Sequence, residues 1–425
     1  MAEQMTEYVC VACGGTLRFD APSGKMKCDY CGSDYEMETV KAYYAEENKK
    51  NAEQDGTLAA ENSWGEDLGS MKAYKCQACG AELVCDETTA ATSCPYCGNV
   101  AIMPQQFKDM MRPQYVIPFK IDKESAKSKL REYCSGKKLL PKTFTNGSHI
   151  DEIKGVYVPF WLYSGTVDAD VRFDASKDEV TKTATEKITN TKHYDVRRKG
   201  GAPFKMIPTD ASSSMPDDLM DSVEPYDYSD IKSFEMEYLA GFLADKYDVS
   251  KEESKTRARK RAEKSTVDML KETVENYDSV NEREAERKVH FLGEKQEYAM
   301  LPVWLLNTSW NGQNFLFAIN GQTGKMTGNL PIDKAKQWIR NLIVAIIIIL
   351  LCCIFTHFQK GGIIFGLILG LIGGLITNSI NVKSMKPVAE RLSAGEYVGS
   401  KKVNVSAKED RYINTTTKKE PINKN

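Results

Sequence analysis

One cysteine spacing occurs twice near the amino terminus and sets the strongest limit on the fold. Each copy reads Cys-x2-Cys, fourteen residues, Cys-x2-Cys, and the second follows the first at an offset of 66 residues. In a zinc ribbon the two-residue gap lets one knuckle turn supply two thiolates, and a short hairpin brings a second knuckle opposite the first. Both copies therefore predict a bound Zn²⁺ ion, with iron as the main competitor for four thiolates. The predicted ligands are Cys10, Cys13, Cys28 and Cys31 in the first ribbon, and Cys76, Cys79, Cys94 and Cys97 in the second.

The sequence around these cysteines is duplicated too. Residues 8–37 align with 74–103 without a gap, which indicates a repeated module. We therefore predict zinc ribbon 1 at 1–39, a charged linker at 40–70 and zinc ribbon 2 at 71–104. Four thiolates leave no open coordination position for water or substrate, so the predicted ions are structural rather than catalytic.

A soluble α+β domain is predicted between residues 112 and 331. Apolar positions at helical spacing predict helices over Lys123–Cys134 and Phe234–Asp245. Asn311-Gly312 lies between two strand-like runs and predicts a hairpin turn. The segment beginning at Pro159, Pro-Phe-Trp-Leu, resembles Pro-Val-Trp-Leu at Pro302, so the domain is interpretable as two related halves.

Residues 250–288 are charged and free of glycine and proline, and they predict a long helix. Its basic cluster is Arg257, Arg259, Lys260 and Arg261. These side chains have the charge to contact phosphates or lipid headgroups. Acidic residues surround them, however, and we favour a solvated helical face.

Two apolar runs, Leu342–Phe358 and Ile363–Ile380, predict a transmembrane helical hairpin over 341–380. The tail 381–425 carries ten basic and five acidic residues, whereas the short turn carries one lysine. The positive-inside rule then places both termini and the ribbons in the cytosol, at a multi-pass cell membrane. Thiolate zinc sites also need a reducing compartment, which favours the same side. A core hairpin of a soluble protein is the less favoured alternative.

A four-residue glycine repeat marks one face of the second run. Small residues at this spacing let helix backbones approach closely in lipid. The partner is either the first apolar run or another subunit in a homo-oligomer, and the sequence leaves both open. The repeat consists of Gly362, Gly366, Gly370 and Gly374.

The tail 381–425 is polar and basic and predicts a disordered cytosolic end. Within it, Lys408–Thr416 is a compact mixed patch that also suits a docking peptide. We keep both interpretations at this stage.

Charge favours protein over nucleic acid as the partner of the ribbons. Residues 1–40 carry three basic and seven acidic side chains, and each filled four-thiolate site adds about two negative charges. An anionic module opposes the phosphate attraction on which nucleic-acid affinity depends. No catalytic constellation stands out, because the four histidines are isolated in sequence. We therefore expect a protein that is not an enzyme.

Several segments together resemble the bacterial double-zinc-ribbon membrane proteins of the YdjG type. They are the two ribbons, Gly155–Trp161, Tyr238–Phe242, Asn320–Lys325 and the apolar hairpin that follows. Such proteins often carry the name of the replication-restart helicase PriA on account of their ribbons, but this chain has no Walker A sequence, so helicase activity is excluded. The resemblance implies a membrane anchor that recruits cytosolic envelope-stress proteins, of the PspA-like and of the SPFH or flotillin-like kinds.

The expected function is that of a membrane-anchored zinc-ribbon scaffold that binds other proteins. The alternative is a membrane-tethered nucleic-acid-binding protein, which predicts steeply salt-dependent binding to DNA or RNA.

Overall fold

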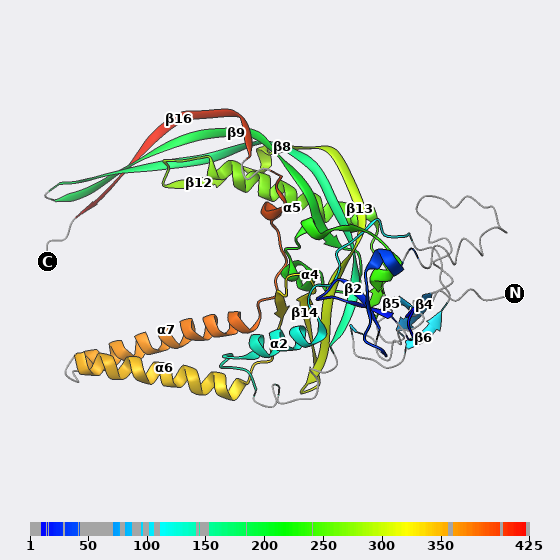
Figure 1. The fold of residues 1–425 in the computed structure, drawn as a ribbon. Helices are drawn as coiled ribbons and strands as arrows, with labels where there is room; N and C mark the ends of the chain where they lie inside the picture. Colours follow the sequence, from blue (N-terminus) through cyan, green and yellow to red (C-terminus); the bar gives the residue numbers. More distant parts are fainter. Residues whose placement is uncertain are drawn as a thin grey trace. The chain divides into compact units, whose positions relative to one another are not determined.

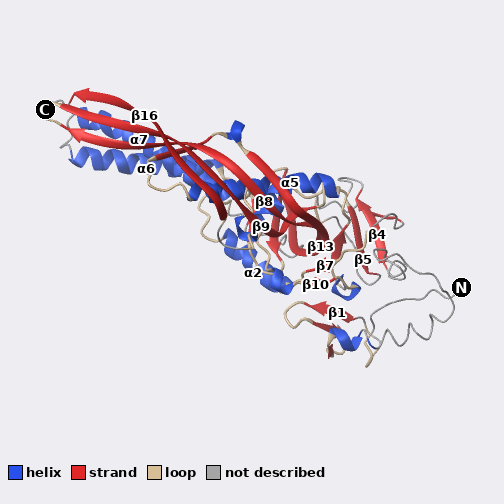
Figure 2. Cartoon of the chain, turned by 90° about the horizontal axis from the view of Figure 1, so that it is seen from above, coloured by secondary structure: helices blue, strands red, loops and turns tan. Residues whose placement is uncertain are grey.

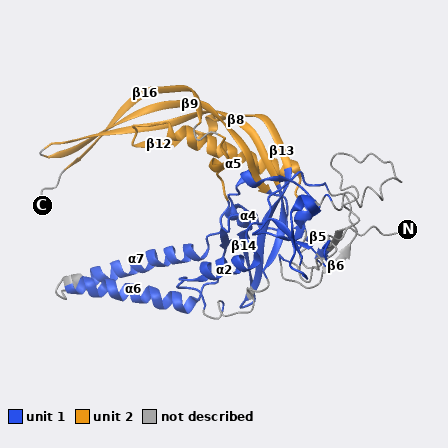
Figure 3. Cartoon of the chain, viewed as in Figure 1, with its two compact units in different colours: residues 1–160, 210–248, 298–390 blue, residues 161–209, 249–297, 391–425 orange. Residues whose placement is uncertain are grey.

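The computed structural model (Figure 1) divides into two compact units, shown in Figure 3. Unit 1 comprises Met1–Phe160, Asp210–Asp248 and Tyr298–Glu390, and unit 2 comprises Trp161–Thr209, Val249–Glu297 and Arg391–Asn425. The protein is thus multidomain, with a large sheet and several helices. The structure describes residues 10–13, 15, 17–28, 30–40, 42, 71–76, 81–86, 95–96, 102–105, 111–141, 144, 153–183, 185–239, 241–355, 360–399 and 403–421.

The first ribbon is a separate three-stranded antiparallel sheet in unit 1. Its strands are β1 (Leu17–Asp20), β2 (Lys25–Cys28) and β3 (Asp34–Tyr35), in the order β1-β2-β3. Alternate side chains, including Leu17 and Met26, point inward and are buried. The turn between β1 and β2 ends at Gly24, whose φ of +69° suits glycine.

The segment predicted as the second ribbon is built differently, because its described strands belong to the 13-stranded sheet. Antiparallel pairing of β11 with β5 makes the connection, and Ala244 lies opposite Val84. The sequence predicted two like modules and gave no sign of this pairing. The main path of the sheet runs β10 (Lys232–Ser233), β7 (Tyr115–Val116), β13 (Lys288–Trp310), β8 (Lys154–Lys182), β11 (Leu243–Asp245), β5 (Glu82–Asp86), β4 (Met71–Cys76), β6 (Ile102–Gln105).

The pairing of β11 also corrects a helix prediction. Over Phe234–Asp245 the structure has a short 3-10 turn, η4 (Met236–Leu239), followed by β11. All three β11 residues are buried between β8 and β5, so strand pairing overrode the local helical spacing. The predicted helix over Lys123–Cys134 is confirmed as α2, with Asp122 as its N-cap.

Aromatic side chains fill the core of unit 1. Phe119 stacks on Phe242 at a centroid distance of 4.1 Å and meets Tyr157 and Trp304 edge-on. Gly155 lies directly beneath Phe242, where an added Cβ would come within 2.5 Å of the ring. Segments that carry the family resemblance therefore meet in this core.

The two halves of the α+β domain make equivalent contacts, in agreement with the predicted relation between them. Trp161 Nε1 donates to the Val249 carbonyl at 3.1 Å, and Trp304 Nε1 donates to the Ile121 carbonyl at 2.8 Å. Each carbonyl lies one residue before the N-cap of a helix, α2 in one half and α5 (Lys251–Glu272) in the other. Two backbone hydrogen bonds are equivalent as well: Ala211 N to Pro159 O, and Gly321 N to Pro302 O.

The hairpin at Asn311-Gly312 is confirmed. β13 and β14 (Gln313–Asn320) pair antiparallel up to Trp310 opposite Gln313. Both turn residues have positive φ, +50° and +73°, as a two-residue type I′ turn requires. The Asn320–Lys325 segment is also a turn, leading to β15 (Met326–Gly328) rather than forming a phosphate loop.

Unit 2 is a long-stranded sheet covered by α5. Figure 2 shows β8, β9 (Glu186–Asp210) and β16 (Asn404–Pro421) side by side, and β16 pairs antiparallel with β9 along its length. Phe173 and Val196 from the sheet pack with Val267 and Leu270 from α5 in one buried cluster. Residues 404–421 of the predicted disordered tail therefore form an edge strand. Partner strand β9 lies about 200 residues away in sequence, so local composition could not reveal it.

Helix α5 is shorter than the predicted helix, and one member of its basic cluster, Arg261, is buried, whereas Lys260 is exposed. The helix ends at Glu272, and Ser279–Glu282 form strand β12, which pairs with β8. Arg261 is only 2% exposed, so the prediction of a solvated face is wrong for this residue. Its guanidinium donates to the carbonyls of Pro208 at 2.7 Å and Ser393 at 3.4 Å. Arg261 thus holds the segment that follows the apolar hairpin against α5.

Replacing Arg261 by alanine should release this segment. Buried hydrogen bonds from a charged donor contribute about 1.5–3 kcal/mol each, and the abandoned carbonyls would be left without their donor. We expect faster tryptic cleavage after Arg391 and a lower unfolding temperature. Limited proteolysis of the full chain measures the cleavage and thermal melting measures the unfolding temperature, with exposed Lys260→Ala as control for both. Equal cleavage of the two variants would contradict this role.

The two apolar runs form helices α6 (Lys334–Phe355) and α7 (Lys360–Met385), which pack against each other. Both are long and apolar enough to cross a membrane. Added Cβ atoms at Gly366 and Gly370 would lie 3.0 Å from Cys352 Cβ and from the Ala345 carbonyl oxygen of α6. The glycine face is therefore turned toward the first run within the chain. For Gly362 the structure describes the helical backbone alone.

Asp245 is a fully buried acid at the junction of β11 and the second ribbon. Burial raises its pKa to about 7, although hydrogen bonds from Ser212 and Tyr96 partly oppose the shift and nearby Asp248 adds to it. The folded state thus keeps a proton that the unfolded chain, with an ordinary carboxyl pKa, would lose.

This shift predicts a pH dependence. The contribution of protonated Asp245 to the free energy of unfolding is fully present below about pH 4. It is lost as pH rises through about 7, and the free energy of unfolding then falls by roughly 4 kcal/mol. Asp245→Asn should flatten the fall in unfolding temperature between pH 5 and pH 7.5. Tryptophan-monitored melting in mild detergent tests this, with exposed Glu272→Gln as control. A parallel fall in wild type and Asp245→Asn would rule out the proposed titration.

Candidate metal centre

Four cysteines of the first ribbon come together at one end of its sheet. Their sulfur atoms all lie within 4.8 Å of one another. The Sγ atoms of Cys10 and Cys31 are 3.5 Å apart, as are those of Cys13 and Cys28. A tetrahedral zinc site with Zn–S bonds of about 2.3 Å needs sulfur separations of about 3.8 Å. The cluster is therefore close enough to bind one metal ion, and its donors fit zinc.

Backbone turns aim these sulfurs inward. The Cys10 amide donates to the Gly15 carbonyl at 2.6 Å, which closes the first knuckle. In the second knuckle the Cys28 amide donates to the Ser33 carbonyl at 2.9 Å, and Gly32 adopts a φ of +73°. Glycine adopts this left-handed backbone conformation at the lowest energetic cost, which explains why glycine directly follows Cys31.

Neighbouring groups set the acidity of the thiols. The hydroxyl and amide of Ser33 hydrogen-bond Cys31 and lower its pKa to about 6. A hydrogen bond from the Tyr35 hydroxyl, 3.1 Å from the sulfur, lowers the pKa of Cys10. At Cys13 the Gly15 amide lowers the pKa, but the thiols of Cys31 and Cys28 outweigh it and raise the value to about 12. Four adjacent thiols thus resist full ionisation until a cation joins them, so metal binding should release protons.

Sequence reasoning predicted the four cysteines that come together but missed the side chains around them. Tyr35 and Ser33 contact ligand sulfurs, at 3.1 Å to Cys10 and 3.2 Å to Cys31. Ser33 follows the final Cys-Gly pair by one residue, a position from which a side chain can reach back to the knuckle. Tyr35 carried no recognisable signal, because its contact depends on β3 pairing with β2.

The second predicted site lies mostly outside the described residues, which include Cys76 but not Cys79, Cys94 or Cys97. Cys76 is buried, and its amide donates to the Ala81 carbonyl at 2.9 Å. This bond is the counterpart of Cys10 to Gly15 in the first ribbon, shifted by 66 residues. The hydrogen bond that closes the first knuckle is therefore repeated, whereas the second metal site itself stays a prediction.

The remaining described cysteines lie away from the cluster. Cys134 in α2 is half-buried, and burial raises its pKa to about 11. Cys352 and Cys353 belong to α6. The side chain of Cys85 lies outside the described residues, so its predicted packing role is untested.

Comparison with known proteins places the chain in a family. It is 33% identical over 329 residues to the uncharacterized protein YdjG of Bacillus subtilis strain 168, a match that covers 77% of this chain and 91% of that protein. The chain belongs to the YdjG family. No family model matches it, and no solved structure matches it. Because the description of YdjG states no activity, membership alone assigns none to this member.

Proposed function

We propose that this protein is a membrane-anchored scaffold in which two zinc-stabilised ribbons recruit cytosolic proteins to the cytoplasmic membrane. The observation that carries the proposal is one chain combining a closed four-cysteine cluster with an apolar helical hairpin whose outer faces are exposed. A cluster of four thiolates offers a folded surface but no open metal position, which suits binding rather than chemistry.

Exposure of the hairpin supports the anchor. Only 6% of the most apolar stretch of α6 and 17% of that of α7 are buried within the chain, whereas a soluble core helix would be mostly buried. Outward aliphatic side chains such as Ile347 and Ile368 are half-exposed along both helices. Lipid is the partner that such a surface needs. Basic flanks and reduced thiols favour a cytosolic position for both ends.

A comparison of the two ribbons supports protein recruitment. Tyr30 and Tyr96 occupy the same position in the repeat, directly before the fourth cysteine. Tyr96 is 5% exposed, and its carbonyl accepts a hydrogen bond from Asn307 of β13. Tyr30 is 81% exposed. The second ribbon therefore uses this knuckle for docking within the chain, and we infer that the first offers its knuckle to another protein.

The class of partner follows from charge and from the resemblance. An anionic ribbon with an exposed tyrosine suits a protein surface better than a phosphate backbone. PspA-like and SPFH or flotillin-like proteins are the partners that the resemblance implies, and we propose them here.

Tyr30→Ser should weaken recruitment strongly. An exposed tyrosine that becomes buried in an interface is a frequent hot spot, with a cost of about 2 kcal/mol or roughly thirtyfold in affinity. Crosslinking in intact cells, followed by quantification of PspA-like and flotillin-like proteins attached to the full chain, measures the loss. Metal content should stay at the wild-type level, because Tyr30 is not a ligand.

The matched control is Tyr412→Ser on β16, where an exposed tyrosine lies in the segment considered as a docking peptide. We expect it to keep its partners. Loss of partners in Tyr412→Ser with retention in Tyr30→Ser would overturn recruitment through the ribbon.

A further inference from the structure

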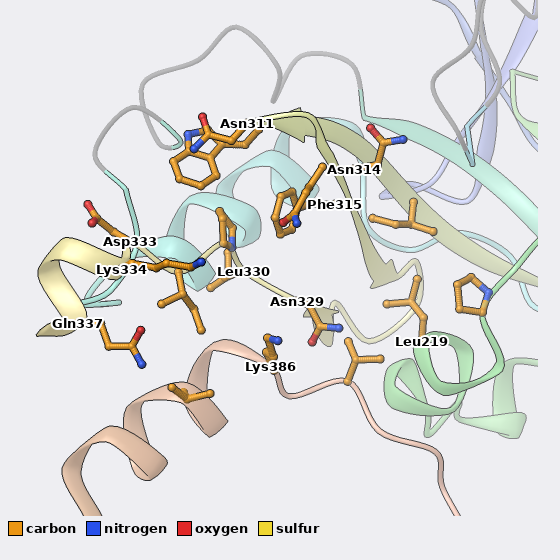
Figure 4. Close-up of a pocket in the computed structure, with 18 of the residues that line it drawn as sticks. Leu219, Asn311, Asn314, Phe315, Asn329, Leu330, Asp333, Lys334, Gln337 and Lys386 are labelled. Carbon is orange, nitrogen blue, oxygen red and sulfur yellow. The ribbon is translucent and has the colours of Figure 1, made fainter. Parts of the chain in front are cut away.

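A large cavity lies in unit 1 at the base of the apolar hairpin. Its volume is about 1050 Å³, just above the range of about 300 to 1,000 Å³ that is typical of small-molecule pockets. The start of α4 (Asp217–Val223), the β13–β14 hairpin, the start of α6 and the chain after α7 all contribute to its wall. Figure 4 shows Leu219, Phe315 and Leu330 among the side chains that line it.

The lining is amphipathic. Leu219, Phe315 and Leu330 supply apolar surface, and amides such as Asn314 and Asn329 add donors and acceptors. Two lysines complete the rim: Lys334 at the start of α6, and Lys386 directly after the end of α7. A ligand with an apolar body and a polar head matches this wall.

The charges of the lining favour an anion. Within the described residues neither Lys334 nor Lys386 has an ion pair, and both are exposed at the rim. The wall also holds two acids, and each accepts amide hydrogen bonds at the start of a helix: Asp218 from Leu219 in α4, and Asp333 from Ala335 and Lys336 in α6. Two unpaired ammonium groups on one rim suit a phosphate.

The position of the cavity along the hairpin supplies the source of that phosphate. Lys334 begins α6, and Trp338, one turn further on, is 67% exposed. Exposed tryptophan on an apolar helix is typical of the headgroup level of a bilayer. Basic side chains at this depth attract anionic lipids.

We propose that this cavity binds an acidic phospholipid of the bilayer, with its phosphate between Lys334 and Lys386 and the adjoining apolar part against Phe315 and Leu330. The inference rests on the proposed membrane anchor. Lipid bound here would fix the base of the hairpin to the α+β domain.

Native mass spectrometry of the full chain in mild detergent, with added phosphatidylglycerol or phosphatidylcholine, tests the proposal. Wild type should retain phosphatidylglycerol preferentially. Each lysine near an anionic headgroup is expected to contribute about fivefold, so Lys334→Gln with Lys386→Gln should lower retention about twenty-fivefold. Asn314→Trp should also lower retention, because it fills the exposed rim without changing charge.

The matched control removes two exposed lysines elsewhere, Lys123→Gln with Lys271→Gln, and should retain lipid like wild type. Equal retention of both lipids, or displacement of phosphatidylglycerol by millimolar inorganic phosphate, would overturn the inference. Alkaline carbonate extraction of membranes separates this failure from failure of the anchor: a protein that resists extraction but retains no acidic lipid keeps its anchor and loses only the proposed site.

Discussion

Replacing Cys10 and Cys28 by serine will remove one equivalent of bound zinc per chain and unfold the first ribbon. Both cysteines are buried in the four-sulfur cluster, and serine is a poor zinc ligand. Structural zinc contributes about 10–16 kcal/mol of apparent binding free energy at pH 7, far more than a three-stranded sheet of this size gains from its own core. Elemental analysis of the purified full chain should show two equivalents in wild type and one in the variant.

Hydrogen exchange adds a structural measurement to the metal count. Amide protection over β1 and β2 should disappear in the variant, whereas protection of β13 and β14 in the α+β domain should persist. The matched control is Cys134→Ser, because this thiol lies in α2 outside the cluster. Two retained equivalents in the double variant, or iron in place of zinc in wild type, would refute the assignment.

Introducing aspartate at Ile347 and Ile368 will release the protein from membranes. Both side chains are about half-exposed on the outer faces of α6 and α7, so in water the change would cost little. At the centre of a membrane helix each aspartate costs about 2.5–3.5 kcal/mol, roughly 6 kcal/mol for the pair. Carbonate extraction should leave wild type in the membrane pellet and move the variant to the supernatant or to degradation.

The control is Leu292→Asp. This exposed leucine lies in β13, outside the apolar helical hairpin, so the variant should stay with the membrane fraction. Wild-type membrane retention of the Ile347→Asp, Ile368→Asp variant would show that the hairpin faces water or protein rather than lipid.

Local patterns in the sequence predicted the elements whose partners lie nearby. Cysteine spacing predicted the first cluster, because its four cysteines lie within 22 residues and a hairpin brings them together. A two-residue turn requires positive φ at both positions, and asparagine and glycine tolerate positive φ best. The Asn311-Gly312 pair therefore predicted the turn that the structure has. Helix α2 was predicted with its observed bounds, since its apolar spacing and its packing agree.

Patterns failed where a distant partner decided the outcome. The polar residues 404–421 lack the composition of a core strand, yet pairing with β9 orders them as β16. The sequence around Arg261 predicts a solvated cation, but the fold places the carbonyls of Pro208 and Ser393 within hydrogen-bond distance of its guanidinium. Leu243–Asp245 has helical spacing but is buried as a strand between β8 and β5.

The sequence by itself predicted the four cysteines that meet in the first cluster, the two apolar helices and the duplicated cysteine spacing, because each depends on residue types at short, fixed spacing. Only the tertiary structure decided that the second ribbon joins the large sheet, that the glycine face meets α6, and that a cavity forms at the base of the hairpin. Those outcomes depend on contacts between residues far apart along the chain, where backbone pairing and burial outweigh local preference.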